Sequence, residues 1–296
     1  MKKTSIIILI AAVLAVGFYL AYKHDRSSKN HPGPANMSGM NMAGMNMGGD
    51  VSKRYTVSFT TNPVNVLPNQ NVELKFKVYD ASSGNEVTDY STVMTKLIHL
   101  VIVNSNLDYF DHIHPVQNGS QFSISTKFPK ADTYHLYINF QPTGATEQQI
   151  GFSLPVGGGT TSPRSNVPVD TSLTKTFGDY KVTLSTADGS DFNANAMNNL
   201  AQIINFHLAD AATGQPITDL SPYLGAFGHL VMVNEETYKY VHIHPIASDN
   251  TAAGGPDVKF LPAILFDKIE PGIYRVFGQF NRNNQVFVAD FTIKLN

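Results

Sequence analysis

His99-Leu-Val-Ile-Val-Asn104, followed by His112-Ile-His114-Pro115, returns 130 residues later in this chain of 296 residues. The second copy is His229-Leu-Val-Met-Val-Asn234, followed by His242-Ile-His244-Pro245. Both copies keep three histidines at the spacing His-x12-His-x-His-Pro. This period is far too long for a solenoid unit, so it indicates that a whole domain has been duplicated.

The residues downstream of the histidines repeat at a slightly longer offset. Tyr134 and Phe140 match Tyr274 and Phe280 at an offset of 140. The difference arises because the second copy carries a longer loop around residues 254–256. The duplication therefore extends into the last part of each domain.

Each copy has the pattern of short β-strands. Residues 72–79 and 180–184 alternate apolar and polar side chains, whereas residues 97–103 and 229–233 are nearly continuous apolar runs typical of strands inside a sandwich. No helical periodicity of useful length follows residue 50. The pattern predicts an all-β fold of two tandem immunoglobulin-like β-sandwich domains.

Composition shifts give the expected boundaries of these domains. We expect a signal-anchor or transmembrane segment at 1–26, a flexible Met-rich tether at 27–52, a first β-sandwich at 53–156, a linker at 157–170 and a second β-sandwich at 171–296. The linker is rich in Gly, Ser, Thr and Pro. That composition predicts two sandwiches that move independently.

The overall composition excludes several classes of protein. The chain has no cysteine, which rules out disulfides, thiolate metal sites, cysteine nucleophiles and a lipid-modified cysteine. Its formal net charge is −2, so it offers no strongly basic surface for nucleic acid. A metal would have to be held by His, Met, carboxylate or backbone groups.

The N-terminus has the pattern of an export signal or membrane anchor. Lys2 and Lys3 precede an uninterrupted apolar run, residues 6–22, whose length is at the short limit for crossing a bilayer. We expect an uncleaved signal-anchor helix, with a cleaved signal peptide as the alternative. Either one places the domains in the cell envelope, in the periplasm or outside the cell.

The segment after the apolar run is unusually rich in methionine. Five methionines fall within eleven residues and are separated by small or polar residues: Met37, Met40, Met42, Met45 and Met47. No larger apolar residue is there to pack with them, so a hydrophobic core does not explain them. Thioether sulfur is a soft ligand that prefers Cu(I) or Ag(I) to Zn(II). The segment therefore predicts a Cu(I) site, and a low-complexity spacer is the alternative.

The repeated histidines predict a second kind of metal site. Residues two apart in a strand share a face, so His112 and His114 present their imidazoles together, and a turn near residue 106 brings His99 across from them. The same folding places His229 beside His242 and His244. Three neutral imidazoles suit Cu(II), with zinc possible. The alternative, strand-end histidines bonded to carbonyls, is weakened because the histidines are kept while the residues between them differ.

Other candidate ligands are set aside by comparing the copies. His135 and His207 meet Arg275 and Lys77 in the partner copy, which indicates ordinary surface positions. Met232 stands where the first copy has Ile102, so we expect it in the core.

With these motifs in view, each copy resembles the YtkA-like domain, and more loosely the small copper-binding sandwiches of the CopC type. The similar motifs are His-Leu-Val-x-Val-Asn, His-Ile-His-Pro and the final Tyr-x5-Phe, and they cover most of residues 72–140 and 201–293. The resemblance implies an immunoglobulin-like fold and a role in envelope metal handling. The N-terminal His ligand of the CopC type has no match here.

The sequence thus predicts an envelope-anchored metal-binding protein that buffers copper or passes it on, and no enzymatic activity. Expected partners are the metal ion, the membrane through the N-terminal helix, and another copper-transport or efflux protein. The alternative is a structural or adhesion-type β-sandwich module that binds a protein partner. A superoxide dismutase also has His-x-His in a sandwich, but no bridging His, disulfide or Arg-bearing loop supports one here.

Overall fold

The computed structural model describes residues 54–158, 167–243, 254–262 and 268–296. All of them belong to one compact unit of the chain. These residues form seventeen β-strands and one short helix, which confirms the predicted all-β class.

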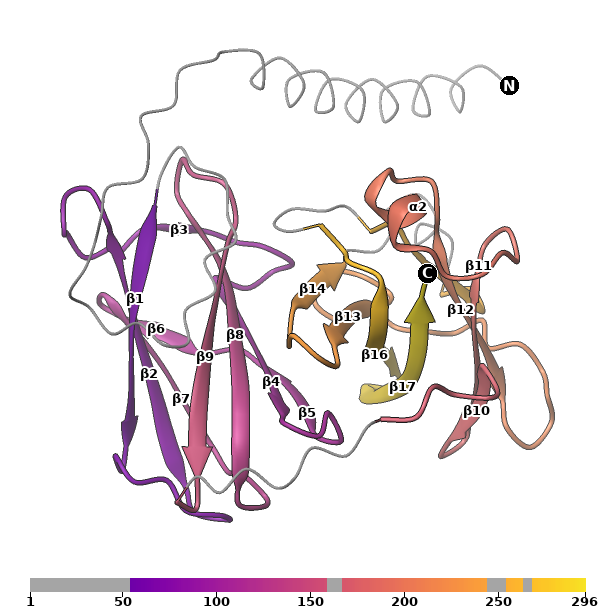
Figure 1. Ribbon diagram of the computed structural model, residues 1–296, viewed down its shortest axis with the longest axis horizontal. Coiled ribbons are helices and arrows are strands. Elements are labelled where there is room, and N and C mark those ends of the chain that lie inside the picture. The colour runs from indigo at the N-terminus through magenta and orange to yellow at the C-terminus, as the bar shows by residue number, and fades with distance from the viewer. Residues whose placement is uncertain (1–53, 159–166, 244–253, 263–267) are drawn as a thin grey trace. The chain divides into compact units, whose positions relative to one another are not determined.

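The first sandwich has two antiparallel sheets (Figure 1). One sheet has the order β1 (Tyr55–Asn62), β2 (Val72–Asp80), β7 (Gln121–Thr126) and β6 (Val116–Asn118). The other has the order β3 (Tyr90–Ser91), β8 (Asp132–Pro142), β4 (Ile98–Asn104) and β5 (Phe110–Ile113), with β9 (Gln148–Val156) paired to β8. Leu74 and Phe76 from the first sheet share a buried core with Leu136 and Ile138 from the second.

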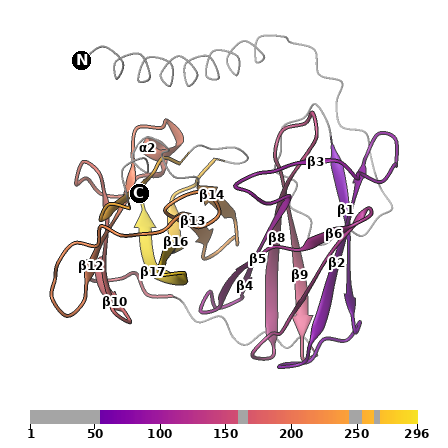
Figure 2. The same ribbon diagram turned by 180° about the vertical axis from the view of Figure 1, so that it is seen from behind.

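The second sandwich repeats this plan (Figure 2). One sheet has the order β10 (Thr174–Phe177), β11 (Tyr180–Thr186), β12 (Ile204–Asp210) and β15 (Asp257–Phe260). The other has the order β14 (Tyr240–Ile243), β13 (His229–Asn234), β16 (Gly272–Arg282) and β17 (Gln285–Leu295). That order matches β5, β4, β8 and β9 of the first sandwich. Met232 is fully buried in this core, as its alignment with Ile102 predicted.

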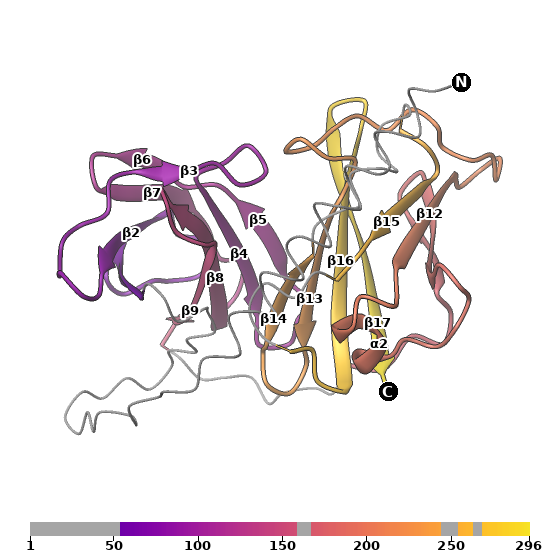
Figure 3. The ribbon, with the colours of Figure 1, turned by 90° about the horizontal axis from the view of Figure 1, so that it is seen from above.

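Among the described residues of the second sandwich, one short helix, α2 (Ala194–Asn198), interrupts the strands. Asn193 caps it by accepting a hydrogen bond from the Ala196 amide. The helix lies beside the C-terminal end of β17, where the Ala194 amide donates to the carbonyl of Asn296 (Figure 3). At five residues it is too short to show helical periodicity in sequence, which is why the sequence did not predict it.

Within the described ranges, the structure has no helix with the length and apolar character needed to cross a bilayer. The predicted anchor, residues 6–22, lies outside those ranges, as does the Met-rich segment.

Strands β4 and β13 are buried on both faces. Leu100 and Ile102 of β4 point into the core of the first sandwich, whereas Val101 and Val103 belong to a separate apolar cluster. That cluster also contains Val231 and Val233, the equivalent residues of β13. The continuous apolar runs in β4 and β13 therefore arise because the two faces of each strand are buried in different places. In each strand, one face packs inside its own sandwich and the other face packs against the other sandwich.

Stacked aromatic rings extend this contact. Phe110 stacks on Phe277 with ring centroids 4.4 Å apart, and Tyr137 stacks on Tyr240 at 4.6 Å. Phe110 corresponds to Tyr240 at the 130 offset and Tyr137 corresponds to Phe277 at the 140 offset, so the two stacks are the same contact seen from either domain. The linker composition predicted independent sandwiches. In the structure the two domains share an apolar cluster.

We predict that Phe277→Ala destabilises the protein by about 3 kcal/mol, because it empties a buried ring position and removes the stack on Phe110. Urea unfolding followed by tyrosine fluorescence measures this loss. Val286→Ala is the control, because Val286 is 44% exposed and its loss should change stability by less than about 0.5 kcal/mol. If both variants unfold alike, the interface contributes nothing to stability.

Candidate metal centre

The hairpin β4–β5 sets the positions of the first three histidines. Its register pairs Val101 with His112 and Leu100 with Ile113, so His99 lies opposite the position of His114, just beyond the end of β5. The turn predicted near residue 106 is confirmed. All three histidines lie on the hairpin face that carries Val101 and Val103, because residues two apart share a face.

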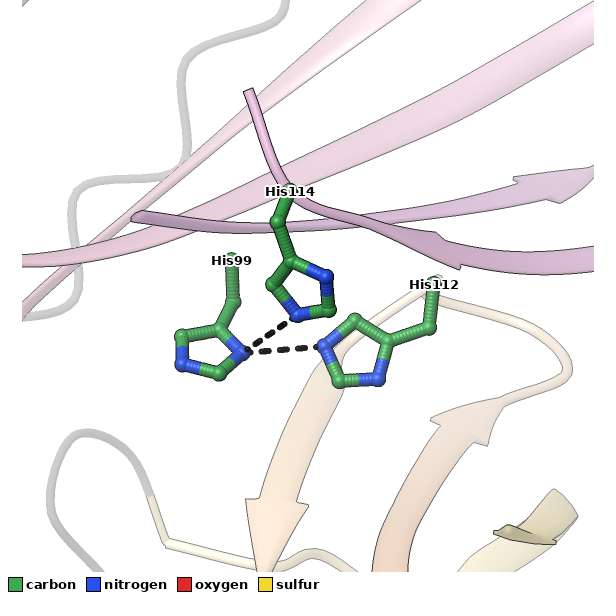
Figure 4. A group of neighbouring side chains, drawn as sticks. All are labelled: His99, His112 and His114. Atoms are coloured by element: carbon green, nitrogen blue, oxygen red, sulfur yellow. Dashed lines mark hydrogen bonds between the residues drawn. The ribbon is translucent and has the colours of Figure 1, made fainter. Parts of the chain in front are cut away.

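The three imidazoles converge (Figure 4). His99 Nδ1 lies 3.0 Å from His112 Nε2 and 3.2 Å from His114 Nε2. One nitrogen from each ring lies within 4.8 Å of the other two, which makes this a group able to hold a metal ion. Nitrogens bound to one tetrahedral ion at ~2.0–2.1 Å would be roughly 3.3 Å apart. The spacing therefore fits a three-histidine site with little rearrangement.

In two of the rings, the nitrogen that points away from the other histidines already makes a hydrogen bond. His99 Nε2 is 2.8 Å from the carbonyl oxygen of Val93, and His112 Nδ1 is 2.6 Å from Oε1 of Gln279. Both oxygens accept hydrogen bonds, so the ring protons lie on these nitrogens, and His99 Nδ1 and His112 Nε2 keep their lone pairs for a ligand. Outer hydrogen bonds of this kind fix the tautomer and orientation of metal-binding histidines.

The centre is largely buried, and burial disfavours the charged form of its rings. His99 is fully buried, and His112 is almost so. Burial lowers the pKa of His112 well below its usual value, and the neighbouring His114 and His99 rings lower it further. Burial also lowers the pKa of His114 to about 3, with His99 and Lys96 contributing. Imidazoles in this state are ready to bind a metal, because a metal requires the unprotonated nitrogen.

The second copy places its histidines in the same way. β13 and β14 pair Val231 with His242, and the rings of His229 and His242 are 6.5 Å apart. His229 Nε2 lies 2.8 Å from the carbonyl oxygen of Tyr223, which is the counterpart of Val93. His244 lies outside the described residues.

The two sets of histidines are not separate in space. The ring of His99 is 5.9 Å from that of His242, and the ring of His112 is 6.0 Å from that of His229. The sequence predicted two sets, one in each sandwich. It could not show that the two sets face each other, because the contact depends on how the sandwiches pack.

The other candidate residues have different surroundings. His207 is a half-exposed residue of β12 whose Nδ1 is 2.9 Å from a carboxylate oxygen of Asp257, which agrees with a surface position. His135 instead stacks on Tyr238 of the second sandwich with ring centroids 3.8 Å apart. His135 is only partly buried, which agrees with a surface position, but this contact with the other domain was not predicted from sequence.

Gln279 is the functional candidate that sequence reasoning missed. It lies on β16 in the second sandwich and reaches His112 in the first. The one signal available in the sequence was a polar residue close to Phe277 and Phe280 in an apolar stretch. In the structure, Gln279 is 5% exposed. Such a residue needs a hydrogen-bond partner, but the sequence does not say which one.

Comparison with known proteins identifies a family without assigning a function. The chain belongs to the family described as "Domain of unknown function (DUF8832)", whose model matches residues 50–157 and 175–296. No curated protein matches the chain. One similar solved structure is described as "Crystal structure of Putative membrane anchored protein from Corynebacterium diphtheriae". It is 10% identical, with a TM-score of 0.19, and the match covers 81% of this chain and 57% of that one.

We predict that acid destabilises the metal-free protein through His112 and His114. In the unfolded chain an imidazole titrates near pH 6.5, whereas burial keeps these two neutral to lower pH in the folded chain. The unfolded state therefore binds protons first, and stability falls as the pH drops below about 6.5. Melting temperatures measured between pH 7 and pH 5 should decrease by a few degrees. His114→Gln should flatten this profile, and an unchanged profile in that variant would contradict the assignment.

Proposed function

We infer that this protein binds a transition metal through His99, His112 and His114, and that copper is the metal. The observation that carries this proposal is the convergence of three imidazole nitrogens, two of them at 3.0 and 3.2 Å from the third. Burial lowers the pKa of His112 and His114, and a carbonyl and an amide oxygen accept hydrogen bonds from the outer nitrogens of His99 and His112. Three histidines leave a position open for a further ligand.

The donor chemistry favours Cu(II) over Zn(II). A site made of imidazole nitrogens binds divalent first-row metals in an order that places Cu(II) above Zn(II). The chain has no cysteine, so no thiolate competes for the ion or changes this preference. Zinc remains the second metal to test.

The proposed role is metal handling and not catalysis. In this proposal the protein buffers copper or passes it to a copper-transport or efflux partner, with Cu(II) at the histidines and Cu(I) at the Met segment. The domains would be immunoglobulin-like sandwiches of the YtkA-like or CopC-like kind, held in the cell envelope by the N-terminal signal-anchor. The duplicated His-x12-His-x-His-Pro motif and the five clustered methionines support this role.

We predict that residues 50–296 take up Cu(II), and that His114→Ala weakens the first uptake by about tenfold or more, because it removes one of three ligands. His114 is half-buried, so this substitution disturbs the core less than one at His99. His207→Ala is the matched control, because His207 lies away from the centre beside Asp257. Calorimetric titration with Cu(II), and competition with Zn(II), measures the effect. Equal uptake by all three proteins would remove the site assignment.

A separate prediction concerns the Met segment, which lies outside the described residues. A peptide of residues 31–50 should bind Ag(I), a stable substitute for Cu(I), and should not bind Zn(II) at equal concentration, because thioethers are soft ligands. The control peptide has leucine at all five methionine positions. Binding of Ag(I) that is the same in both peptides would reduce the segment to a spacer.

A further inference from the structure

Five described histidines from two sandwiches gather at one place. Their ring centroids lie as close across the domain boundary as within each copy. The distances are 5.9 Å for His99–His242 and 6.0 Å for His112–His229, against 5.3 Å for His99–His112 and 6.5 Å for His229–His242. Two independent sites on two sandwiches would not show this equality.

The two cross-domain contacts are the same contact repeated. At the offset of 130, His99 corresponds to His229 and His112 corresponds to His242. The pair His99–His242 therefore becomes the pair His229–His112 when the copies are exchanged. An interface that places the same patch of two partners face to face has this two-fold character. The aromatic stacks beside it have the same character.

The second copy offers the same ligand atom as the first. His99 Nε2 is bonded to the Val93 carbonyl, and His229 Nε2 is bonded to the equivalent carbonyl of Tyr223, both at 2.8 Å. In each ring the nitrogen that can bind a metal is then Nδ1. A ligand tautomer that is fixed in the same way in both copies indicates the same chemistry in both.

Each domain also contributes to the surroundings of the other domain's histidines. Gln279 of the second sandwich accepts the hydrogen bond from His112 Nδ1 of the first at 2.6 Å. His112 and His242 are 6% and 3% exposed, and the apolar cluster of Val101, Val231 and Phe277 adjoins them. The rings share one environment shielded from water.

From these contacts we propose that the two sandwiches form a single two-ion centre across their interface, with one ion on the histidines of each copy. This proposal rests on the proposed metal-binding function and goes beyond it, because it makes the centre a property of the paired domains. One ion is held by His99, His112 and His114. The other is held by His229 and His242.

The ring positions limit the separation of the two ions. A metal bonded to an imidazole lies roughly 3 Å from the ring centre, given a metal–nitrogen bond of ~2 Å. Two ions on rings whose centres are 6.0 Å apart are therefore separated by about 12 Å at most. Two Cu(II) ions this close interact magnetically, whereas ions in two unconnected sandwiches give independent signals.

The test is electron paramagnetic resonance of the full chain, purified in detergent and titrated with Cu(II). We expect two equivalents to bind at the histidines and to give a dipolar-broadened spectrum. His229→Ala/His242→Ala should bind one equivalent and give the sharp spectrum of an isolated ion. His207→Ala, the control, should keep the coupled spectrum. The wild-type spectrum decides the matter even where the double variant does not fold.

The outcomes separate this proposal from the proposed function. Two equivalents with sharp, uncoupled spectra would overturn the two-ion centre and leave metal binding intact. One equivalent that is lost on substituting histidines of either copy would overturn it in favour of a single shared ion. If the protein retains neither Cu(II) nor Zn(II) after dialysis, that result contradicts both the proposed function and this inference.

Discussion

The contact between the faces of two equivalent hairpins is the constraint on which the rest of the structure depends. Val101 and Val103 of β4 meet Val231 and Val233 of β13, and full burial of such a side chain contributes about 1.5–3 kcal/mol. The histidines occupy the same hairpin faces: His112 pairs with Val101 and His242 pairs with Val231. The apolar contact that joins the sandwiches therefore also removes the imidazoles from water.

Burying polar rings between two domains has an energetic cost that the structure offsets locally. A buried polar group without a partner costs on the order of 1–3 kcal/mol, and the carbonyls of Val93 and Tyr223 avoid part of that cost for His99 and His229. Those hydrogen bonds use Nε2 of each ring, so Nδ1 is the nitrogen that can bind a metal. Burial also keeps His112 neutral by lowering its pKa. The same environment that is costly for charge is suited to neutral metal ligands.

The two halves are related by duplication but are no longer equivalent. Gln279 reaches His112, whereas its counterpart at the 140 offset is the shorter Asn139. The amide of Asn139 donates to Glu147 at 3.5 Å, and burial raises the pKa of that carboxyl group to about 7. The surroundings of His242 therefore differ from those of His112. Duplication supplied two similar faces, and later substitutions made them distinct.

By itself the sequence determined the all-β class, the duplication, the hairpin near residue 106 and the grouping of His99 with His112 and His114. These follow from side-chain periodicity and short spacings, which act within one strand or one turn. The packing of the sandwiches, the approach of His242 to His99 and the role of Gln279 were decided by tertiary structure alone. A continuous apolar run shows that both faces of a strand are buried. It cannot show what covers the second face, because that depends on surfaces brought together from distant parts of the chain.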